Sequence, residues 1–183
     1  MPRFPIVVEL RGLIQRQPEE EEQSLGIVID PELGKNFLSQ LTNKPTYKVY
    51  CKADPRFHLT IRDDKVILAP TDPPNQFQHW YKDDKFSTIV TGQALKHSLE
   101  ETKPVQLIAY NPNDVDESIL WSQGEDMGGG YKRIRMVNNI HLNLDANHGC
   151  FGVHDGTMIV VSGRNTRANQ KWKIEPYCKF LKN

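Results

Sequence analysis

The segment NHGCFGVHD, residues 147–155, contains a dense group of potential metal ligands. His148, Cys150, His154 and Asp155 fall within eight residues, and imidazole, thiolate and carboxylate together could bind a soft metal ion. Zinc sites, however, normally pair their ligands at closer spacing and take a fourth ligand from a position that the fold fixes. We therefore interpret the segment as a polar surface loop, and we expect neither a metal ion nor another cofactor.

The segment MGGGYKRIR, residues 127–135, is glycine-rich and basic. A phosphate-binding loop would need Gly-Lys-Ser/Thr followed by a helix, and a strand pattern follows here instead. Arg133 and Arg135 share one face of that strand, which is more often solvated than bound to nucleic acid. The sequence also offers no Ser-His-Asp or paired-carboxylate arrangement that could be placed with useful geometry. We therefore expect a protein that is not an enzyme.

Two segments repeat the order glutamine, any residue, tryptophan. NQFQHW places Gln78 before Trp80, and NQKW places Gln170 before Trp172. Residues two apart lie on the same face of a strand, so the tryptophan can fill a core while the glutamine amide binds loop backbone. The pattern therefore predicts first of all a folding device, with any ligand role as a second use of the same loop.

Short strands and tight turns must position these residues. In FHLTIRDDKVILAP, Leu59 and Ile61 alternate with polar residues before Asp63-Asp64, and Val66 and Leu68 alternate after it. This is the pattern of a β-hairpin. RIRMVNNIHLNLD repeats it around a central Asn-Asn pair, and long helical periodicity is absent. The sequence therefore favours an all-β fold.

The tryptophans indicate an internal repeat. They occur at positions 80, 121 and 172, separated by 41 and 51 residues, and each follows two strand patterns and a polar loop. Repeats of this length imply one supersecondary unit per repeat around a shared core. We predict three imperfect lobes, each closed by a tryptophan that points inward.

The overall composition limits the classes of partner that the protein is expected to bind. The 183 residues include 23 basic and 23 acidic side chains, so no overall basic field attracts nucleic acid or an anionic membrane. No apolar run approaches the roughly 20 residues of a membrane span. The three cysteines lack framework spacing and are expected as reduced thiols. We expect no nucleic-acid partner and no membrane partner.

The chain divides into three parts by composition. Residues 1–46 form an arm, partly disordered, that carries the acidic run RQPEEEEQ and one strand pattern, PRFPIVVEL. Residues 47–178 carry the repeats, and residues 179–183 form a tail.

Specific strings within residues 47–177 resemble the plant Euonymus-lectin-related family of ricin-B-like lectins. They include LTIRDDKVILAPTDPPNQFQHWYKDDKFST, YKRIRMVNNIHLNLDANHG and NQKWKIEPY. The resemblance implies a β-trefoil, glycan binding, residence in the nucleus and cytoplasm, and association with stress responses. In relatives, a strand that opens the second lobe normally lies between FSTIV and TGQALKHS. That stretch is missing here, so we expect a trefoil that lacks one strand in the second lobe.

The resemblance also implies a sugar site in the third lobe. A trefoil lectin pocket combines a carboxylate and amides that bind hydroxyls with an aromatic ring that stacks on the sugar. Asp145 stands where the carboxylate is expected, and Asn165, Asn169 and Gln170 can supply the amides. Relatives carry tryptophans at the positions of Ser162 and Arg164, so Arg164 is the candidate platform here.

The other two lobes lack a full set of such residues. The second lobe offers Tyr110 and Asn111, with His97 at the place matching Asp145. The first lobe offers Asp63 and Asp72, with Pro70 where an aromatic ring would be wanted. We therefore predict the site in the third lobe.

The leading hypothesis is a non-enzymatic lectin of the nucleus and cytoplasm whose partners are glycans or glycoproteins. A single sugar would bind weakly, so useful affinity would require a multivalent glycan or a weak homo-oligomer. The alternative is a degenerate trefoil that binds no sugar and serves as a protein-interaction or stress scaffold, with the acidic run as a partner contact. A third possibility is that the shortened second lobe prevents the barrel from closing.

Overall fold

The computed structural model describes residues 3–4, 6–8, 45–82, 93–109, 116–148 and 152–177. Within these ranges the chain forms thirteen strands in one sheet and three short 3₁₀ helices. None of these helices has the length and apolar character needed to cross a bilayer. The acidic run at 16–23, Tyr110, Asn111 and Cys150 lie outside the described residues, so the predictions for them stay predictions.

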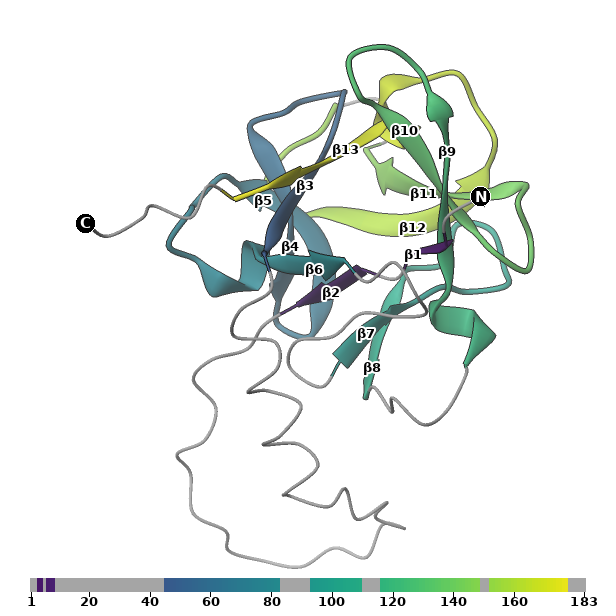
Figure 1. Cartoon of the computed structure of the whole chain (residues 1–183), viewed down its shortest axis with the longest axis horizontal. Helices are drawn as coiled ribbons and strands as arrows, with labels where there is room; N and C mark the ends of the chain where they lie inside the picture. The colour runs from purple at the N-terminus through teal and green to yellow at the C-terminus, as the bar shows by residue number, and fades with distance from the viewer. Residues whose placement is uncertain are drawn as a thin grey trace, which may run out of the picture.

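The strands group into three lobes around a common core (Figure 1). The first lobe comprises β3 (Tyr47–Cys51), β4 (Phe57–Arg62), β5 (Lys65–Pro70), η1 (Gln76–Gln78) and β6 (Trp80–Lys82). The second comprises β7 (Gln93–Lys96), β8 (Gln106–Ala109), η2 (Glu117–Ile119) and β9 (Trp121–Asp126). The third comprises β10 (Lys132–Met136), β11 (Leu142–Asn147), β12 (Thr157–Gly163), η3 (Ala168–Gln170) and β13 (Trp172–Pro176). The prediction of an all-β, three-lobed fold is therefore confirmed.

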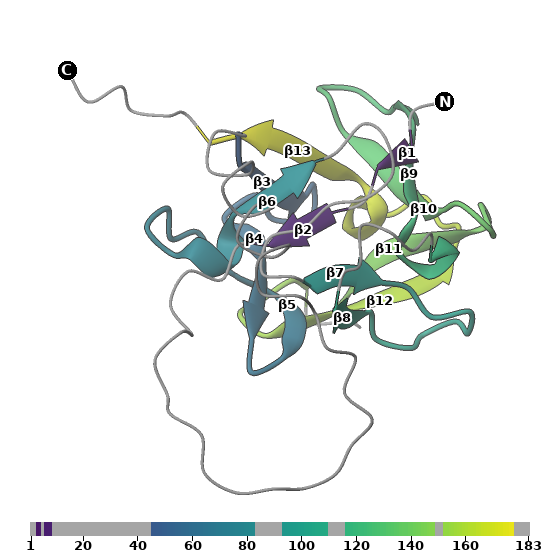
Figure 2. The same cartoon turned by 60° about the horizontal axis from the view of Figure 1, so that its bottom comes forward.

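Two further strands come from the N-terminal part of the chain. β1 (Arg3–Phe4) pairs with β9, and β2 (Ile6–Val8) pairs with β6 and β7. Both views place them against the second lobe (Figures 1 and 2). The strand pattern in PRFPIVVEL thus forms, whereas the division of the chain at residue 46 stays a prediction.

The barrel closes as a ring of antiparallel neighbours. β9 pairs with β10, β10 with β13, β13 with β3, and β3 with β6, while β2 and β1 connect β6 back to β9. The hairpins β4–β5, β7–β8 and β11–β12 complete the three lobes. The third possibility, an open barrel, does not describe this structure.

The predicted hairpin turn at Asp63-Asp64 is confirmed. Arg62 pairs with Lys65, so the two aspartates form a two-residue loop, with φ angles of 51° and 56°. Two consecutive left-handed residues match the right-handed twist of the flanking strands, and aspartate tolerates this conformation better than most side chains. The turn therefore fixes the register of β4 against β5.

The three tryptophans form the centre of the core, as predicted. Trp80 is 1% exposed, and Trp121 and Trp172 are fully buried. Each indole Nε1 donates a hydrogen bond to a leucine carbonyl: Trp80 to Leu59 at 2.8 Å, Trp121 to Leu95 at 2.9 Å and Trp172 to Leu144 at 2.8 Å. Each leucine is itself fully buried. These bonds attach the closing strand of every lobe to its hairpin and define equivalent positions in the three lobes.

Candidate functional site

Asp145 lies on β11, the strand whose Leu144 carbonyl accepts the hydrogen bond from the Trp172 indole. It follows Leu144 on β11 and pairs with Val160 of β12, and its side chain is only 5% exposed. The backbone of both strands is fixed by the ladder, so the position of the carboxylate is set by the hairpin and by the tryptophan beneath it.

Three amide side chains donate hydrogen bonds to the Asp145 carboxylate. Asn169 Nδ2 reaches Oδ1 at 2.6 Å, Gln170 Nε2 reaches Oδ2 at 2.8 Å, and Asn165 Nδ2 reaches Oδ2 at 3.3 Å. Burial raises the pKa of Asp145, and the three amides together with nearby His148 act in the opposite direction. The structure therefore brings together four of the five predicted site residues: Asp145, Asn165, Asn169 and Gln170.

Gln170 also pins the loop that carries these amides. Its Nε2 donates to the Gly163 carbonyl at 2.8 Å, and its Oε1 accepts the Asn165 backbone N–H at 2.9 Å. A guanidinium nitrogen of Arg133 on β10 donates to the Asn165 carbonyl at 2.9 Å. The predicted folding role of the glutamine is confirmed, and in this lobe the same amide is part of the polar cluster.

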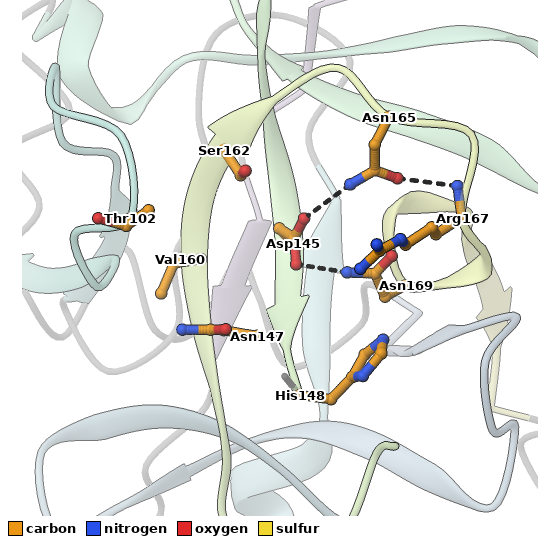
Figure 3. A pocket seen from close by; sticks show the side chains of 9 residues that line it. All are labelled: Thr102, Asp145, Asn147, His148, Val160, Ser162, Asn165, Arg167 and Asn169. Carbon is orange, nitrogen blue, oxygen red and sulfur yellow. Dashed lines mark hydrogen bonds between the residues drawn. The ribbon is translucent and has the colours of Figure 1, made fainter. Parts of the chain in front are cut away.

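A pocket of about 190 Å³ opens beside this cluster (Figure 3). Its wall consists of Thr102, Asp145, Asn147, His148, Val160, Ser162, Asn165, Arg167 and Asn169. Thr102 comes from the second lobe and has a φ of 64°, a rare conformation for a β-branched residue. Its backbone N–H donates to the Val161 carbonyl at 2.8 Å, which brings this part of the second lobe to the pocket.

The predicted platform residue Arg164 is exposed and is not part of the pocket wall. Arg167 lies in the wall instead, and its backbone N–H donates to Asn165 Oδ1 at 2.8 Å. A different arginine, three residues further along an irregular loop, thus lines the pocket, which strand periodicity does not predict. Ser162, at the other position where relatives carry tryptophan, lines the pocket.

Sequence reasoning missed His148 as a pocket residue, since it was considered only as a metal ligand. Its half-buried ring lines the pocket, and its Nδ1 is buried without a hydrogen-bond partner among the described residues. Asn169 Oδ1 is likewise buried and unpaired within the described part of the chain. His148 directly follows β11, three residues after Asp145, which is the one signal that could have placed it here.

Two of the four potential metal ligands in residues 147–155 make contacts elsewhere, and Cys150 lies outside the described residues. Asp155 forms an ion pair with Arg62 at 2.9 Å, and the His154 N–H donates to Thr157 Oγ1 at 2.9 Å. In the ranges that the structure describes, no three potential ligands gather around one point.

The hydrogen bonds from the tryptophan indoles to leucine carbonyls identify the residues of the other two lobes that are equivalent to Asp145. Asp145 follows Leu144, so its equivalents are the residues after Leu59 and Leu95, which are Thr60 and Lys96. The predicted match, His97, is one residue further on, directly after the end of β7. Its side chain is buried, and its ring meets Trp121 edge-on at 5.3 Å. The first two lobes therefore lack the carboxylate at this position.

Two curated plant proteins are close relatives in sequence, although no family model matches the chain. Ricin B-like lectin EULS3 of Arabidopsis thaliana is 47% identical over 86% of this chain and 56% of its own length. Ricin B-like lectin R40G3 of Oryza sativa subsp. japonica is 46% identical over 75% of this chain and 76% of its own length. The chain thus spans about half the length of the Arabidopsis protein and about three quarters of the rice protein.

The fold is shared with solved lectin structures. The C-terminal half of an earthworm R-type lectin, solved in complex with GalNAc, matches 73% of this chain and 99% of its own, with a TM-score of 0.51 at 17% identity. At that identity the likeness shows the β-trefoil fold alone. The identity and coverage of the rice relative establish that the chain belongs to the ricin B-like lectins.

Proposed function

We propose that this chain binds glycans through the pocket beside Asp145 in the third lobe. One observation carries the proposal: a buried carboxylate is held by three amide side chains at the wall of an open pocket. Membership of the ricin B-like lectins supports the ligand class, and the earthworm lectin is an example of the fold with a bound sugar.

The hydrogen-bonding groups fit a sugar hydroxyl. A carboxylate has about four acceptor sites, and the three amides use one on Oδ1 and two on Oδ2 of Asp145. The remaining site on Oδ1 can accept a hydroxyl proton, and charged acceptors form the stronger bonds. Because the amides already hold the carboxylate in one orientation, its side chain loses little conformational entropy when a sugar binds.

Among the residues that the structure describes, no tryptophan, tyrosine or phenylalanine lines the pocket. We assign the role of the ring to His148, whose imidazole can pack against the C–H face of a sugar, with Val160 as further apolar surface. A small ring buries less area than an indole, so one site gives weak affinity. Multivalent glycans or weak self-association would then provide avidity.

A glycan array probed with the full-length protein tests the proposal. We expect selective binding, loss of that binding in Asp145→Asn, and at least a tenfold loss in His148→Ala. His154→Ala is the matched control, because it removes an exposed histidine outside the pocket wall. Circular dichroism must show each variant folded. Glycan binding that survives in a folded Asp145→Asn variant would contradict the site.

The two arginines of the loop provide a second matched pair. Arg167→Ala should weaken glycan binding because Arg167 lines the pocket, while Arg164→Ala should leave it unchanged. The opposite order would return the platform role to Arg164, as the family resemblance implies.

Ser162 and Arg164 stand where relatives carry tryptophan, and this supports the second candidate, a scaffold that binds protein instead of sugar. A folded protein that binds nothing on a broad array would favour this alternative. Affinity purification with and without the acidic run at residues 16–23 would then test that run as the partner contact.

Residence in the nucleus and cytoplasm, and a role in stress responses, form part of the same proposal and rest on the family resemblance. A fluorescent fusion, followed before and after drought or salt treatment, tests both. Exclusion of the fusion from the nucleus and cytoplasm would contradict this part of the proposal.

A further inference from the structure

The connection between the first and second lobes is too short to repeat the pattern of the third. Ten residues, 83–92, separate β6 from β7. Fifteen residues, 127–141, separate β9 from β11, and five of them form β10, the opening strand of the third lobe. The second lobe therefore needs its opening strand from another part of the chain.

Opening strands have a characteristic set of neighbours in this fold. β10 pairs with β9 of the preceding lobe, with β11 of its own hairpin and with β13, which closes its own lobe. β3 has the same three relations in the first lobe, to β13, β4 and β6. An opening strand of the second lobe should accordingly pair with β6, β7 and β9.

β1 and β2 together make these three pairings. β2 is antiparallel to both β6 and β7, and β1 is antiparallel to β9. In Figure 2 the two strands lie along β6 and β9, with β7 beside β2. One residue separates β1 from β2, so Arg3–Val8 has the length of a single opening strand.

The pairing register of Arg3–Val8 agrees with that of β3 and β10 at every position where the three can be compared. The residue opposite the tryptophan of the preceding lobe is Cys51, Val8 or Met136 in the three lobes. The residue before it faces the hairpin, in the pairs Tyr50–His58, Val7–Ala94 and Arg135–Asn143. The residue four positions before it faces the tryptophan of its own lobe, in the pairs Tyr47–Trp80, Phe4–Trp121 and Lys132–Trp172. Three independent pairings thus give the same alignment.

We infer that Arg3–Val8 is the opening strand of the second lobe, supplied by the N-terminus of the same chain. The slot between β6, β7 and β9 is then a strand-binding site, and its occupant is this segment. Positions 6 and 8 correspond to Val49 and Cys51 in the first lobe and to Ile134 and Met136 in the third, all of which are 0–1% exposed. Isoleucine and valine at positions 6 and 8 suit such core positions.

The N-terminal segment occupies the slot for the same energetic reason that a peptide adds a strand to an open sheet edge. An empty slot would leave backbone groups of β6, β7 and β9 unpaired and would expose the core beneath them. Only residues 9–44 connect the donor strand to the rest of the barrel. Because loop closure costs little more as a loop lengthens, a connection of 36 residues still favours insertion within one chain over exchange with a second copy.

A disulfide between positions 7 and 94 tests the inference in the full-length protein. At the equivalent pair of the first lobe, the rings of Tyr50 and His58 stack with centroids 5.6 Å apart, so facing side chains at this position meet. We expect Val7→Cys/Ala94→Cys to form an intramolecular bond, seen as a monomer on a non-reducing gel and as a linked peptide by mass spectrometry. Val7→Cys/Ala69→Cys is the control, because Ala69 is a buried alanine that faces His58 outside the slot.

Each other outcome of the crosslinking experiment overturns the inference. A covalent dimer would show that the slot is filled by a second copy. Crosslinking no greater than in the control would show that the N-terminal strand does not occupy the slot.

A pair of adjacent substitutions gives an independent measurement. Val8→Arg should lower the thermal unfolding midpoint by roughly 5 °C or more, because position 8 corresponds to two fully buried residues. Val7→Arg should change it much less, because position 7 corresponds to Arg135 in the third lobe. Equal midpoints for the two variants would overturn the assigned register. Neither measurement depends on glycan binding.

Discussion

The first and third lobes share one arrangement of a buried glutamine, the loop backbone that it binds and a buried tryptophan, which we call the frame. They differ in the side chains that this frame positions. In the first lobe, Gln78 Nε2 donates to the Pro70 carbonyl at 2.8 Å, and Gln78 Oε1 accepts the Asp72 N–H at 2.9 Å. Gln170 makes the same two contacts in the third lobe, with Gly163 and Asn165. Both glutamines are buried and both precede a buried tryptophan by two residues. The frame is therefore independent of any ligand role.

The residues set in that frame are different. The position of Asp145 is taken by Thr60 in the first lobe, and Thr60 Oγ1 donates to the His58 carbonyl at 2.7 Å. Asn165 corresponds to Asp72, and Asn169 corresponds to Phe77, which packs against the core. The first lobe thus keeps the glutamine but has neither the buried carboxylate nor the two asparagines that help to hold it. The loop geometry is therefore repeated in the two lobes, while the buried carboxylate and its asparagine donors are present only in the third of them.

Removing a tryptophan should have the largest effect and should be equal in the two lobes. Trp80→Ala and Trp172→Ala each empty a buried indole site and release a leucine carbonyl, so each should cost about 3–5 kcal/mol in the free energy of unfolding. Urea unfolding followed by circular dichroism measures this. A much smaller loss in one lobe would break the equivalence of the two frames.

Substitution of the two glutamines should distinguish an effect on stability alone from an effect on both stability and glycan binding. Gln78→Ala and Gln170→Ala each leave a backbone N–H and a carbonyl without their partner, so each should cost about 1–3 kcal/mol. Gln170→Ala should also weaken glycan binding, because it removes a donor to Asp145, whereas Gln78→Ala should not. Urea unfolding and glycan titration of both variants make the measurement. Equal loss of binding in both would indicate that the site depends on overall stability alone.

The first lobe should respond to acid through His58. Burial, reinforced by Lys48, lowers the pKa of His58 to about 4 from an ordinary value near 6.5. Protonation therefore favours the unfolded chain, so stability is full above pH 6.5 and falls as the pH drops from 6.5 towards 4. The difference in thermal midpoint between the native protein and His58→Gln should change across this interval. A difference that stays constant with pH would show that His58 is not the titrating group.

The smallest effect should come from the ion pair that joins the two lobes. Arg62 and Asp155 lie 2.9 Å apart, and about half of each side chain is exposed. Surface pairs of this kind contribute about 0–1 kcal/mol, so Arg62→Ala should shift the thermal midpoint only slightly, and less so in high salt. A large shift would mean that the relative placement of the first and third lobes depends on this contact.

Much of the fold could be predicted from local signals in the sequence. Alternation around Asp63-Asp64 indicated a hairpin because side-chain period and turn chemistry both act within a few residues. The spacing of Trp80, Trp121 and Trp172 indicated three lobes because each closing strand needs its own core residue. For the site, Asp145 and the three amides were found through the family resemblance, and the structure shows them in contact.

The structure departs from the sequence-based expectations in the position of individual side chains. Arg164 and Arg167 belong to a loop, where no periodicity tells which side chain turns towards the pocket. His97 was matched to Asp145 by sequence alone, and a one-residue shift on a strand moves a side chain to the opposite face. The tryptophan bond to Leu95 shows that Lys96 is the equivalent residue.

The sequence by itself determined the hairpins, the three-lobed repeat and the pairing of glutamine with tryptophan, since these follow from residue type and short-range spacing. Tertiary structure alone decided that Thr102 and His148 share a pocket with Asp145. It also decided that β1 pairs with β9 and that β2 pairs with β6 and β7, although more than 70 residues separate β2 from β6. A strand is placed by the edges that can pair with it and by the core that it covers, and neither depends on where the strand lies along the chain.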